Sequence, residues 1–324
     1  MSTGEPVHHF TAKPVTLPLR PTHGHKGTFG TVLVIGGCTL VPPEAPHRAV
    51  RMFGGASLAA LAALRSGCGL ARLMTPAPVL DAALSVAPVC TGVPMPVDSD
   101  GGVIAHRVAE ALDVQLAQVQ CIVIGPALGG GEPAAGTAGH ALEQIVLRVL
   151  MQTQVPVVAD ADAVNALARI PDAARDVRAA AVVTPHPGEF ARLAASLGVA
   201  FDASRDEARE PAARAVAQRL GVTVVLKGAR TIVTDGHHAW TLDRPNPALA
   251  TGGSGDVLAG LIGGLIAQHH LGPDADSLTD MAKAGVWAHA EAGARWANES
   301  GATGGLLATD LLDRIPACVE ALRR

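Results

Sequence analysis

The sequence predicts an α/β protein whose central sheet is mostly parallel. Short runs rich in β-branched residues alternate with longer segments rich in alanine and leucine along almost the whole chain, which is typical of βαβ units. The short runs are almost continuously apolar rather than alternating, as expected for strands that helices cover on both faces. These observations favour one sheet between two layers of helices.

Six apolar runs are the expected parallel strands, at residues 31–35, 70–74, 120–124, 155–159, 180–183 and 222–226. The expected helices are residues 56–65, 104–117, 137–151, 187–197, 205–220, 256–268, 277–298 and 306–322. Two more strands, 230–233 and 238–242, flank the turn sequence Thr234-Asp235-Gly236-His237 and should form a β-hairpin.

The chain shows no internal repeat and no low-complexity linker in its middle, so we expect one domain over residues 17–324. Residues 1–16 are expected to be a loosely ordered extension. A proline-rich stretch, residues 38–53, interrupts the first strand–helix connection and is longer than such loops usually are. Its length indicates a functional or mobile segment.

Composition excludes several classes of function. The 324 residues carry 25 Lys and Arg against 29 Asp and Glu, and only 2% are aromatic, so the features of a nucleic-acid-binding protein are missing. The five cysteines are scattered and form no C-x-x-C pair, which favours reduced thiols over disulfides or a zinc ribbon. With no signal peptide and no apolar stretch long enough to span a bilayer, we expect a cytoplasmic protein without a membrane partner.

Glycines and polar residues follow nearly every expected strand. Ligands of open parallel sheets bind beyond the carboxyl ends of the strands, so these segments should meet in one place. They are Gly36-Gly37, GPALGGG at 125–131, DADAVNAL at 160–167, TPHPGEF at 184–190 and KGART at 227–231. Their glycines, carboxylates, histidine and lysine indicate a phosphate-bearing ligand.

The strongest segment is NPALATGGSGDVLAG, residues 246–260. Gly252, Gly253 and Gly255 can adopt backbone angles closed to other residues, and a helix should begin directly after them, so that successive N–H groups would converge on an anion. Asp256 lies in the first turn, where its carboxylate is either a stabilising charge for the helix or a base directed at the same anion. The G-x-x-x-x-G-K-[ST] loop is absent, and the dinucleotide-binding fingerprint is not favoured.

The ordered set of motifs resembles the ADP- or ATP-dependent NAD(P)H-hydrate dehydratases, a family with a ribokinase-like three-layer α/β/α fold. The resemblance runs from about Leu17 to the C-terminus and rests on HKGTFGTVLVIGG (25–37), GGASLAALAALRSGCGL (54–70), IGPALG (124–129), ADADAVNAL (159–167), TPHPGEF, VLKGART (225–231) and NPALATGGSGDVLAG. It implies repair of NADHX or NADPHX, the cofactors hydrated at C6 of the nicotinamide ring. The C6 hydroxyl would be phosphorylated from ADP or ATP, and loss of phosphate would restore NADH or NADPH.

The resemblance also implies roles for individual residues. Asp256 would be the catalytic base. The residues expected to contact the hydrate are Ala56, Gly129, His186 and Asp256. The expected anion hole is formed by Gly252, Gly253, Ser254 and Gly255, and the expected nucleotide contacts are Lys227, Gly228, Ala229, Arg230, Thr231 and Gly255.

Some of these residues have a plainer interpretation. His186 is alternatively a hydrogen-bonded structural histidine, and Lys227 a solvated lysine at the end of a strand. Asp160 and Glu189 would hold Mg²⁺ through water, because Mg²⁺ keeps part of its hydration shell and takes few protein ligands. Both are alternatively helix-capping acids, with Asp162 able to replace Asp160.

The resemblance further implies partners and an assembly. We expect an NAD(P)H-hydrate epimerase on a separate chain, because only about 16 residues precede the dehydratase-like region. Relatives are commonly homotetramers, and we expect the same here. Two departures from the family pattern stand out: the proline-rich stretch 38–53 replaces a short loop, and Ala127 occupies a position where glycine is commoner.

Two other classes of function stay open. One is a small-molecule kinase of the same fold that acts on a hydroxymethylpyrimidine, a thiazole alcohol or a sugar. Thiamin-precursor kinases of this fold usually have cysteine in place of Asp256 and lack His186 within Thr-Pro-His-Pro-Gly-Glu. The other is a non-catalytic nucleotide-binding protein, against which the intact Asp256, glycine segment and Lys227 argue.

Overall fold

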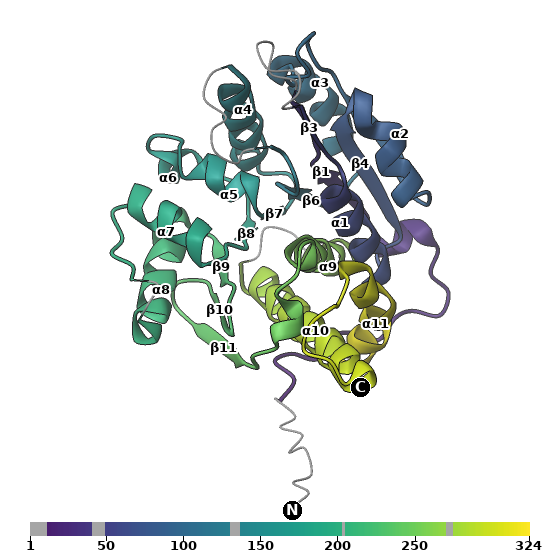
Figure 1. The fold of residues 1–324 in the computed structure, drawn as a ribbon, viewed down its shortest axis with the longest axis vertical. Coiled ribbons are helices and arrows are strands. Elements are labelled where there is room, and N and C mark those ends of the chain that lie inside the picture. The colour runs from purple at the N-terminus through teal and green to yellow at the C-terminus, as the bar shows by residue number, and fades with distance from the viewer. Residues whose placement is uncertain (1–11, 41–48, 130–136, 203–204, 270–274) are drawn as a thin grey trace, which may run out of the picture.

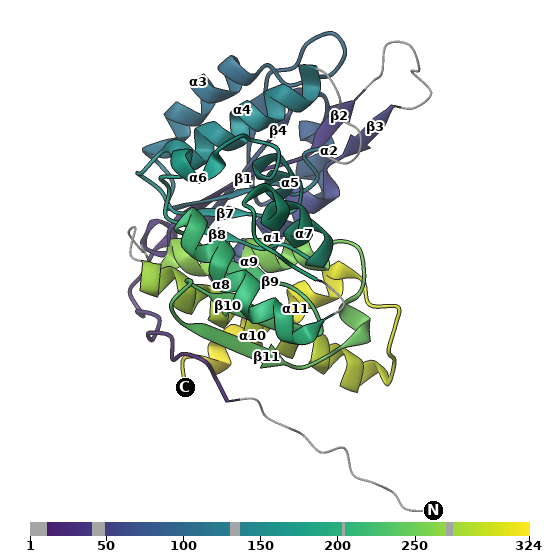
Figure 2. The same cartoon turned by 90° about the vertical axis from the view of Figure 1, so that its left-hand side faces the viewer.

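One nine-stranded sheet lies between two layers of helices, as Figures 1 and 2 show. The computed structural model describes residues 12–40, 49–129, 137–202, 205–269 and 275–324. Its sheet contains β1 (Thr31–Ile35), β4 (Leu70–Pro76), β5 (Thr91–Met95), β6 (Cys121–Ile124), β7 (Val157–Ala159), β8 (Ala181–Val183), β9 (Thr223–Leu226), β10 (Arg230–Thr234) and β11 (Ala239–Asp243). The predicted α/β class is confirmed.

The strand order of the sheet creates a crevice at its centre. The order is β11-β10-β9-β8-β7-β6-β1-β4-β5, and only β10 runs antiparallel to its neighbours β9 and β11. The chain moves outward from β1 through β4 to β5 and then returns to β6 on the other side of β1. Such a reversal leaves space beyond the carboxyl ends of the two strands, where α/β proteins bind their ligands.

Alternation along the central strand divides the core between the two faces. In β1, Val32 and Val34 pack on one face while Leu33 and Ile35 pack on the other, and all four are fully buried. On the first face lie α1 (Gly54–Arg65), α2 (Ala77–Val86), α9 (Ser254–Gln268), α10 (Ala275–Ser300) and α11 (Ala308–Ala321). On the second lie α3 (Ala105–Leu116), α4 (Thr137–Met151), α5 (Asp162–Leu167), α6 (Ala173–Asp176), α7 (Pro187–Ser196) and α8 (Arg209–Leu220).

Glycines allow α9 to pack directly on its neighbours. A Cβ atom on Gly260 would lie 2.0 Å from the carbonyl oxygen of Ala59 in α1, and one on Gly264 would lie 2.2 Å from Oγ of Ser66. On the opposite side of α9, a Cβ atom on Gly263 would lie 2.4 Å from Val123 of β6. These helix glycines therefore serve close packing, which fixes α9 against both α1 and the sheet.

All six expected parallel strands and the hairpin are present, with ends that differ by at most two residues. Two further elements, α2 and β5, were not among the expected ones, and both contain proline. Pro78 lies in the first turn of α2, where no N–H donor is lost, and Pro94 lies in β5 at the edge of the sheet. The expected helix 205–220 is a short 3₁₀ turn, η3 (Asp206–Ala208), followed by α8.

The proline-rich stretch contributes a second, small sheet. β2 (Cys38–Leu40) and β3 (Val50–Met52) pair antiparallel and project beside the carboxyl end of β1, as Figure 2 shows. The stretch between them, 41–48, lies outside the described residues, as do residues 1–11 of the expected N-terminal extension.

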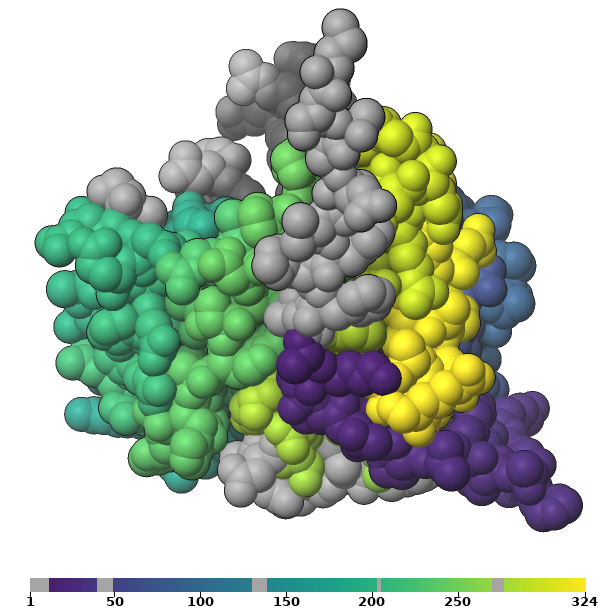
Figure 3. Space-filling view, turned by 90° about the horizontal axis from the view of Figure 1, so that it is seen from below, coloured from purple at the N-terminus to yellow at the C-terminus, as the bar shows by residue number. Residues whose placement is uncertain are grey.

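The two ends of the described chain lie side by side. The buried Leu17 donates its N–H to the carbonyl of Leu322 (2.9 Å), and the guanidinium of Arg323 donates to the carbonyl of Pro18. Figure 3 shows this N-terminal segment against the C-terminal helix. Within the described residues, no helix has the length and apolar character needed to cross a membrane.

Substituting Gly260→Ala should destabilise the fold although alanine is the better helix former. The methyl group would meet the backbone of α1, which cannot move aside, and we expect the free energy of unfolding to fall by about 1–3 kcal/mol. Gly54→Ala is the matched control, because a Cβ atom there meets nothing within 4 Å. Urea unfolding measures both variants, and equal stability of Gly260→Ala and the wild type would contradict the packing argument.

Candidate active site

A buried ion pair joins three neighbouring strands at their carboxyl ends. Nζ of Lys227, after β9, lies 2.8 Å from Oδ1 of Asp160, which follows β7, and Oγ1 of Thr184, after β8, donates to the same oxygen at 2.6 Å. The Asp160 side chain is 1% exposed and that of Lys227 is 19% exposed. Burial alone would lower the pKa of Lys227, but the carboxylates of Asp160 and Glu189 outweigh it and raise the pKa, so the lysine stays charged.

No side chain accepts a hydrogen bond from the N–H groups in the first turn of α9. The helix begins at Ser254, two residues earlier than expected, and is preceded by Gly253 with φ +87°, a conformation suited to glycine. No side chain caps this end. We call residues 252–256 the glycine turn. The Ser254 amide donates to the carbonyl of Thr251 at 3.4 Å, whereas the amides of Gly255 and Asp256 have no partner within the helix. These two N–H groups and the positive helix end are available to an anion.

Asp256 lies in the glycine turn, next to the start of α1. A Cβ atom on Gly55 would lie 2.9 Å from Oδ2 of Asp256, so the two helix ends approach each other at this carboxylate. Burial raises the pKa of Asp256 to about 7, and the negative charge of Asp160 adds to the shift, while Lys227 opposes it. A carboxyl group with this pKa can exchange a proton near neutral pH.

His186 and Glu189 form the N-terminal cap of α7. The amides of Gly188 and Glu189 donate to Nδ1 of His186 at 3.0 and 3.3 Å, and the amide of His186 donates to Oε2 of Glu189 at 2.9 Å. Nε2 of the same ring lies 3.2 Å from the other carboxylate oxygen. Burial and the nearby Lys227 lower the pKa of His186, in keeping with a neutral ring. His186 is thus a hydrogen-bonded structural histidine in its local contacts, but half of its side chain remains exposed to the site.

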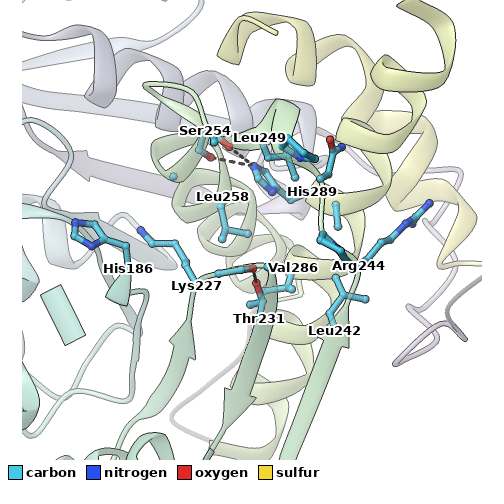
Figure 4. Close-up of a pocket in the computed structure, with 18 of the residues that line it drawn as sticks. His186, Lys227, Thr231, Leu242, Arg244, Leu249, Ser254, Leu258, Val286 and His289 are labelled. Atoms are coloured by element: carbon cyan, nitrogen blue, oxygen red, sulfur yellow. Dashed lines mark hydrogen bonds between the residues drawn. The ribbon is translucent and has the colours of Figure 1, made fainter. Parts of the chain in front are cut away.

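A cavity of about 650 Å³ opens between the hairpin and helices α9 and α10, as Figure 4 shows. Its walls are mainly apolar, formed by Leu242, Leu249, Leu258, Val286 and Ala290. At the polar end it is lined by His186, Lys227, Gly228, Ala229, Thr231, Ser254 and Gly255. An apolar cleft that ends in a lysine and a helix N-terminus suits a heterocyclic base attached to phosphates.

The expected site residues separate into two groups around Asp256. Most expected nucleotide contacts line the cavity, whereas Ala56, Gly129 and Asp256 do not. Ala56 packs beside Gly36 at the end of β1, and the amide of Gly129 donates to Oδ2 of Asp162 at 2.8 Å, after β6. Ala56 and Gly129 therefore lie at the carboxyl ends of β1 and β6, where the strand order reverses, whereas the expected hydrate contact His186 lines the cavity.

The Arg230 side chain points away from the cavity. It pairs with Asp206 and lies 3.4 Å from Oδ2 of Asp243, on the outer face of the hairpin. Alternation along β10 explains this, because the adjacent Thr231 lines the cavity. A motif such as KGART does not show which of its side chains face the ligand.

The unusual Ala127 adopts the backbone conformation of the glycine that it replaces. Its φ is +58°, in the left-handed region that alanine rarely occupies. It follows Gly125, where a Cβ atom would lie 1.7 Å from the carbonyl oxygen of Asp160. The turn after β6 thus places alanine in a conformation that favours glycine.

Both expected metal ligands already accept hydrogen bonds from the protein. Asp160 accepts hydrogen bonds from Thr184 and Lys227, and Glu189 accepts one from the His186 amide. Among the described residues, no group of three or more His, Cys, Asp and Glu side chains is placed to hold a metal ion. The geometry does not support direct ligation, and contact through water stays a prediction.

Two residues of the site were not singled out from the sequence. Thr184 belongs to a quoted motif, but only the fold shows that it donates to Asp160. His289 lies in α10, far from every motif, and its Nε2 lies 3.0 Å from the carbonyl oxygen of Ser254. A single histidine within a long helix gives no signal of such a contact.

Comparisons with known proteins show the class to which the fold belongs. The fold is that of the ribokinase-like superfamily, to which solved structural neighbours belong. The family model described as NAD(P)H-hydrate dehydratase matches residues 49–317, and the chain belongs to this family.

Two relatives and one solved structure illustrate the match. The ADP-dependent (S)-NAD(P)H-hydrate dehydratase of Lactiplantibacillus plantarum is 34% identical over 279 residues, covering 85% of this chain and 83% of that one. The bifunctional NAD(P)H-hydrate repair enzyme of Coxiella burnetii is 36% identical over 94% of this chain, which spans about half (53%) of that enzyme. The ADP/ATP-dependent NAD(P)H-hydrate dehydratase of Bacillus subtilis, co-crystallised with ATP and Mg²⁺, is 29% identical with a TM-score of 0.70, over 95% of each chain.

Removing one partner of the buried ion pair should be costly for the fold. Lys227→Met leaves Asp160 as a buried charge without its counterion, and we expect the free energy of unfolding to fall by about 3 kcal/mol or more. Adding Asp160→Asn should recover part of this loss. Lys283→Met is the control, because Lys283 pairs with the half-exposed Asp280 and should contribute less than about 1 kcal/mol. Urea unfolding of the wild type, Lys227→Met, Asp160→Asn and the double variant shows the coupling, with Lys283→Met alongside, and additive losses in the two single variants would contradict it.

Proposed function

We propose that this protein dehydrates (6S)-NAD(P)H hydrate to NAD(P)H, with ADP or ATP as the phosphoryl donor. The observation that carries the proposal is the position of Asp256. Its carboxylate lies in the uncapped glycine turn, between a cavity suited to a nucleotide and the residues expected to contact the hydrate. Family membership supplies the substrate class.

The chemistry follows from this placement. Asp256 takes the proton of the C6 hydroxyl, whose oxygen attacks the terminal phosphorus of the nucleotide as the bond to the bridging oxygen breaks. The products of this step are a C6 phosphate ester and AMP from ADP, or ADP from ATP. The lone pair of the ring nitrogen then expels phosphate from C6, and loss of the C5 proton forms the C5–C6 double bond of NAD(P)H.

The nucleotide would lie in the cavity with its phosphates toward the glycine turn. The base would pack between Leu242, Leu258 and Val286. Lys227 and the N–H groups of the turn would neutralise charge on the transferring phosphoryl group. Of the segment 227–231, the side chain of Arg230 contributes nothing directly in this arrangement, because it lies on the outer face of the hairpin.

Mg²⁺ would enter with the nucleotide phosphates and neutralise part of their charge. Asp160 and Glu189 would then contact it through water, since their carboxylates already accept protein hydrogen bonds. We further propose a cytoplasmic homotetramer that works with an NAD(P)H-hydrate epimerase on a separate chain.

Replacing the proposed base should abolish repair without abolishing nucleotide binding. With hydrated NADH, Mg²⁺ and ADP or ATP, we expect Asp256→Asn to lose about 100-fold or more in kcat, because general-base catalysis contributes at least that much. The measurement is the return of dihydronicotinamide absorbance, with the dissociation constant of ADP measured by calorimetry. Asp310→Asn is the matched control, because Asp310 also lies in the first turn of a helix but far along the chain, where it caps α11.

The outcomes separate the candidate functions. Wild-type turnover by Asp256→Asn would contradict the role of the base. No recovery by the unaltered protein with either nucleotide, together with phosphorylation of another alcohol, would identify a small-molecule kinase. Nucleotide binding with neither reaction would identify a non-catalytic protein.

The rate should also depend on pH as the ionisation of Asp256 requires. A base acts in its ionised form, so with both substrates saturating we expect kcat to rise about tenfold per pH unit below pH about 7 and to level off above it. The dissociation constant of ADP over the same range is the control, because it should change less than the rate. A rate independent of pH from about 5.5 to 8 would show that a proton transfer at this carboxylate does not limit kcat.

A further inference from the structure

His289 connects α10 to the glycine turn from the side opposite the N–H groups. Its Nε2 lies 3.0 Å from the carbonyl oxygen of Ser254 and 3.2 Å from Oγ of the same residue. The histidine is 9% exposed and lines the cavity, and Figure 4 shows its ring directed at Ser254. Because a carbonyl oxygen only accepts hydrogen bonds, Nε2 carries the proton and donates.

The glycine turn lacks the side-chain cap that stabilises most helix ends. Helix ends are normally held by a side chain that accepts from the first N–H groups, which is worth about 1 kcal/mol. At α7, His186 does this and occupies two amides. At α9 no side chain does so, and the preceding glycines add conformational freedom. A site that binds an anion through N–H groups cannot be capped through those same groups.

We propose that His289 is a positioning residue that holds the glycine turn by its carbonyl and hydroxyl, leaving its N–H groups free for the phosphates of the nucleotide. This inference rests on the proposed function. The bond fixes the Ser254 peptide from the α10 side without competing for any donor of the turn. Its effect should therefore appear mainly in nucleotide binding and phosphoryl transfer. Binding of the hydrate should change less, because its expected contacts Ala56 and Gly129 lie at β1 and β6, although Asp256 lies in the glycine turn.

The chemical state of His289 suits this role. Burial, together with the charge of Lys227, lowers the pKa of His289 to about 4, although the hydrogen bond to Ser254 opposes the shift. The ring is therefore neutral at physiological pH and keeps one N–H donor in a fixed place. A lysine or arginine here would add a second buried cation next to Lys227, which is unfavourable.

Two substitutions of His289 test the proposal through ADP binding. His289→Leu fills the space but removes the donor, and we expect the dissociation constant of ADP with Mg²⁺ to rise about tenfold or more, with a fall in kcat. His289→Gln can place an amide N–H near the position of Nε2 and should stay within about threefold of the wild type. The KM for hydrated NADH should change less than the dissociation constant of ADP in His289→Leu.

Thr279→Val is the matched control for a loss of stability alone. Thr279 is also buried in α10 and hydrogen-bonded, to Thr223 at 2.7 Å, but at the start of β9, away from the glycine turn. We expect it to lower the melting temperature without changing ADP binding. If Thr279→Val and His289→Leu weaken ADP binding equally, or if folded His289→Leu binds ADP like the wild type, the proposal is wrong.

The remaining outcomes also support or overturn the proposed role of His289. If His289→Leu does not fold, His289→Asn replaces it, because its shorter amide does not reach Ser254, and wild-type ADP affinity of that variant would overturn the proposal. If the wild type binds ADP but does not dehydrate the hydrate, the proposed function fails while the role of His289 is still read from ADP binding. If the wild type binds neither ADP nor ATP, both proposals fall.

Discussion

The uncapped first turn of α9 is the constraint on which the rest of the site depends. A helix end can bind an anion only if its N–H groups stay unoccupied, and such an end is weaker than a capped one. The surrounding structure supplies the missing rigidity. Gly260 and Gly264 let α9 lie against α1, Gly263 lets it lie against β6, and His289 holds the Ser254 peptide from α10. The glycines that weaken α9 as an isolated helix are those that fix it in the fold.

Electrostatics around the site follow from one lysine among several carboxylates. Lys227 is neutralised by Asp160, and Asp256 and Glu189 lie near enough to raise its pKa further. Lys227 is already paired with Asp160, so its positive charge stabilises the Asp256 carboxylate only in part. Burial and the nearby negative charge of Asp160 therefore raise the pKa of Asp256. The same arrangement thus provides a permanent cation for phosphate and a carboxyl group that exchanges its proton near neutral pH.

Much of the fold was predictable because its central strands are apolar on both faces and separated by long helical segments. Errors arose where a residue's effect depends on position in the sheet or helix. Pro94 is compatible with a strand only because β5 lies at the edge, and Pro78 is compatible with a helix only because it lies in the first turn of α2. Local sequence does not distinguish these positions from the interior ones that proline would disrupt.

The site was predictable as a set of motifs but not as a set of contacts. Segments after successive parallel strands meet because of topology, so Asp160, Thr184 and Lys227 could be expected near one another. Which side chain of a motif faces the ligand depends on strand alternation, which turns Arg230 away. His289 comes from a helix that contributes no motif, and its partner is a backbone carbonyl, an atom that every residue has. Contacts of this kind leave no trace in the identity of the partner, so only the packed structure reveals that a side chain of α10 holds the first residue of α9.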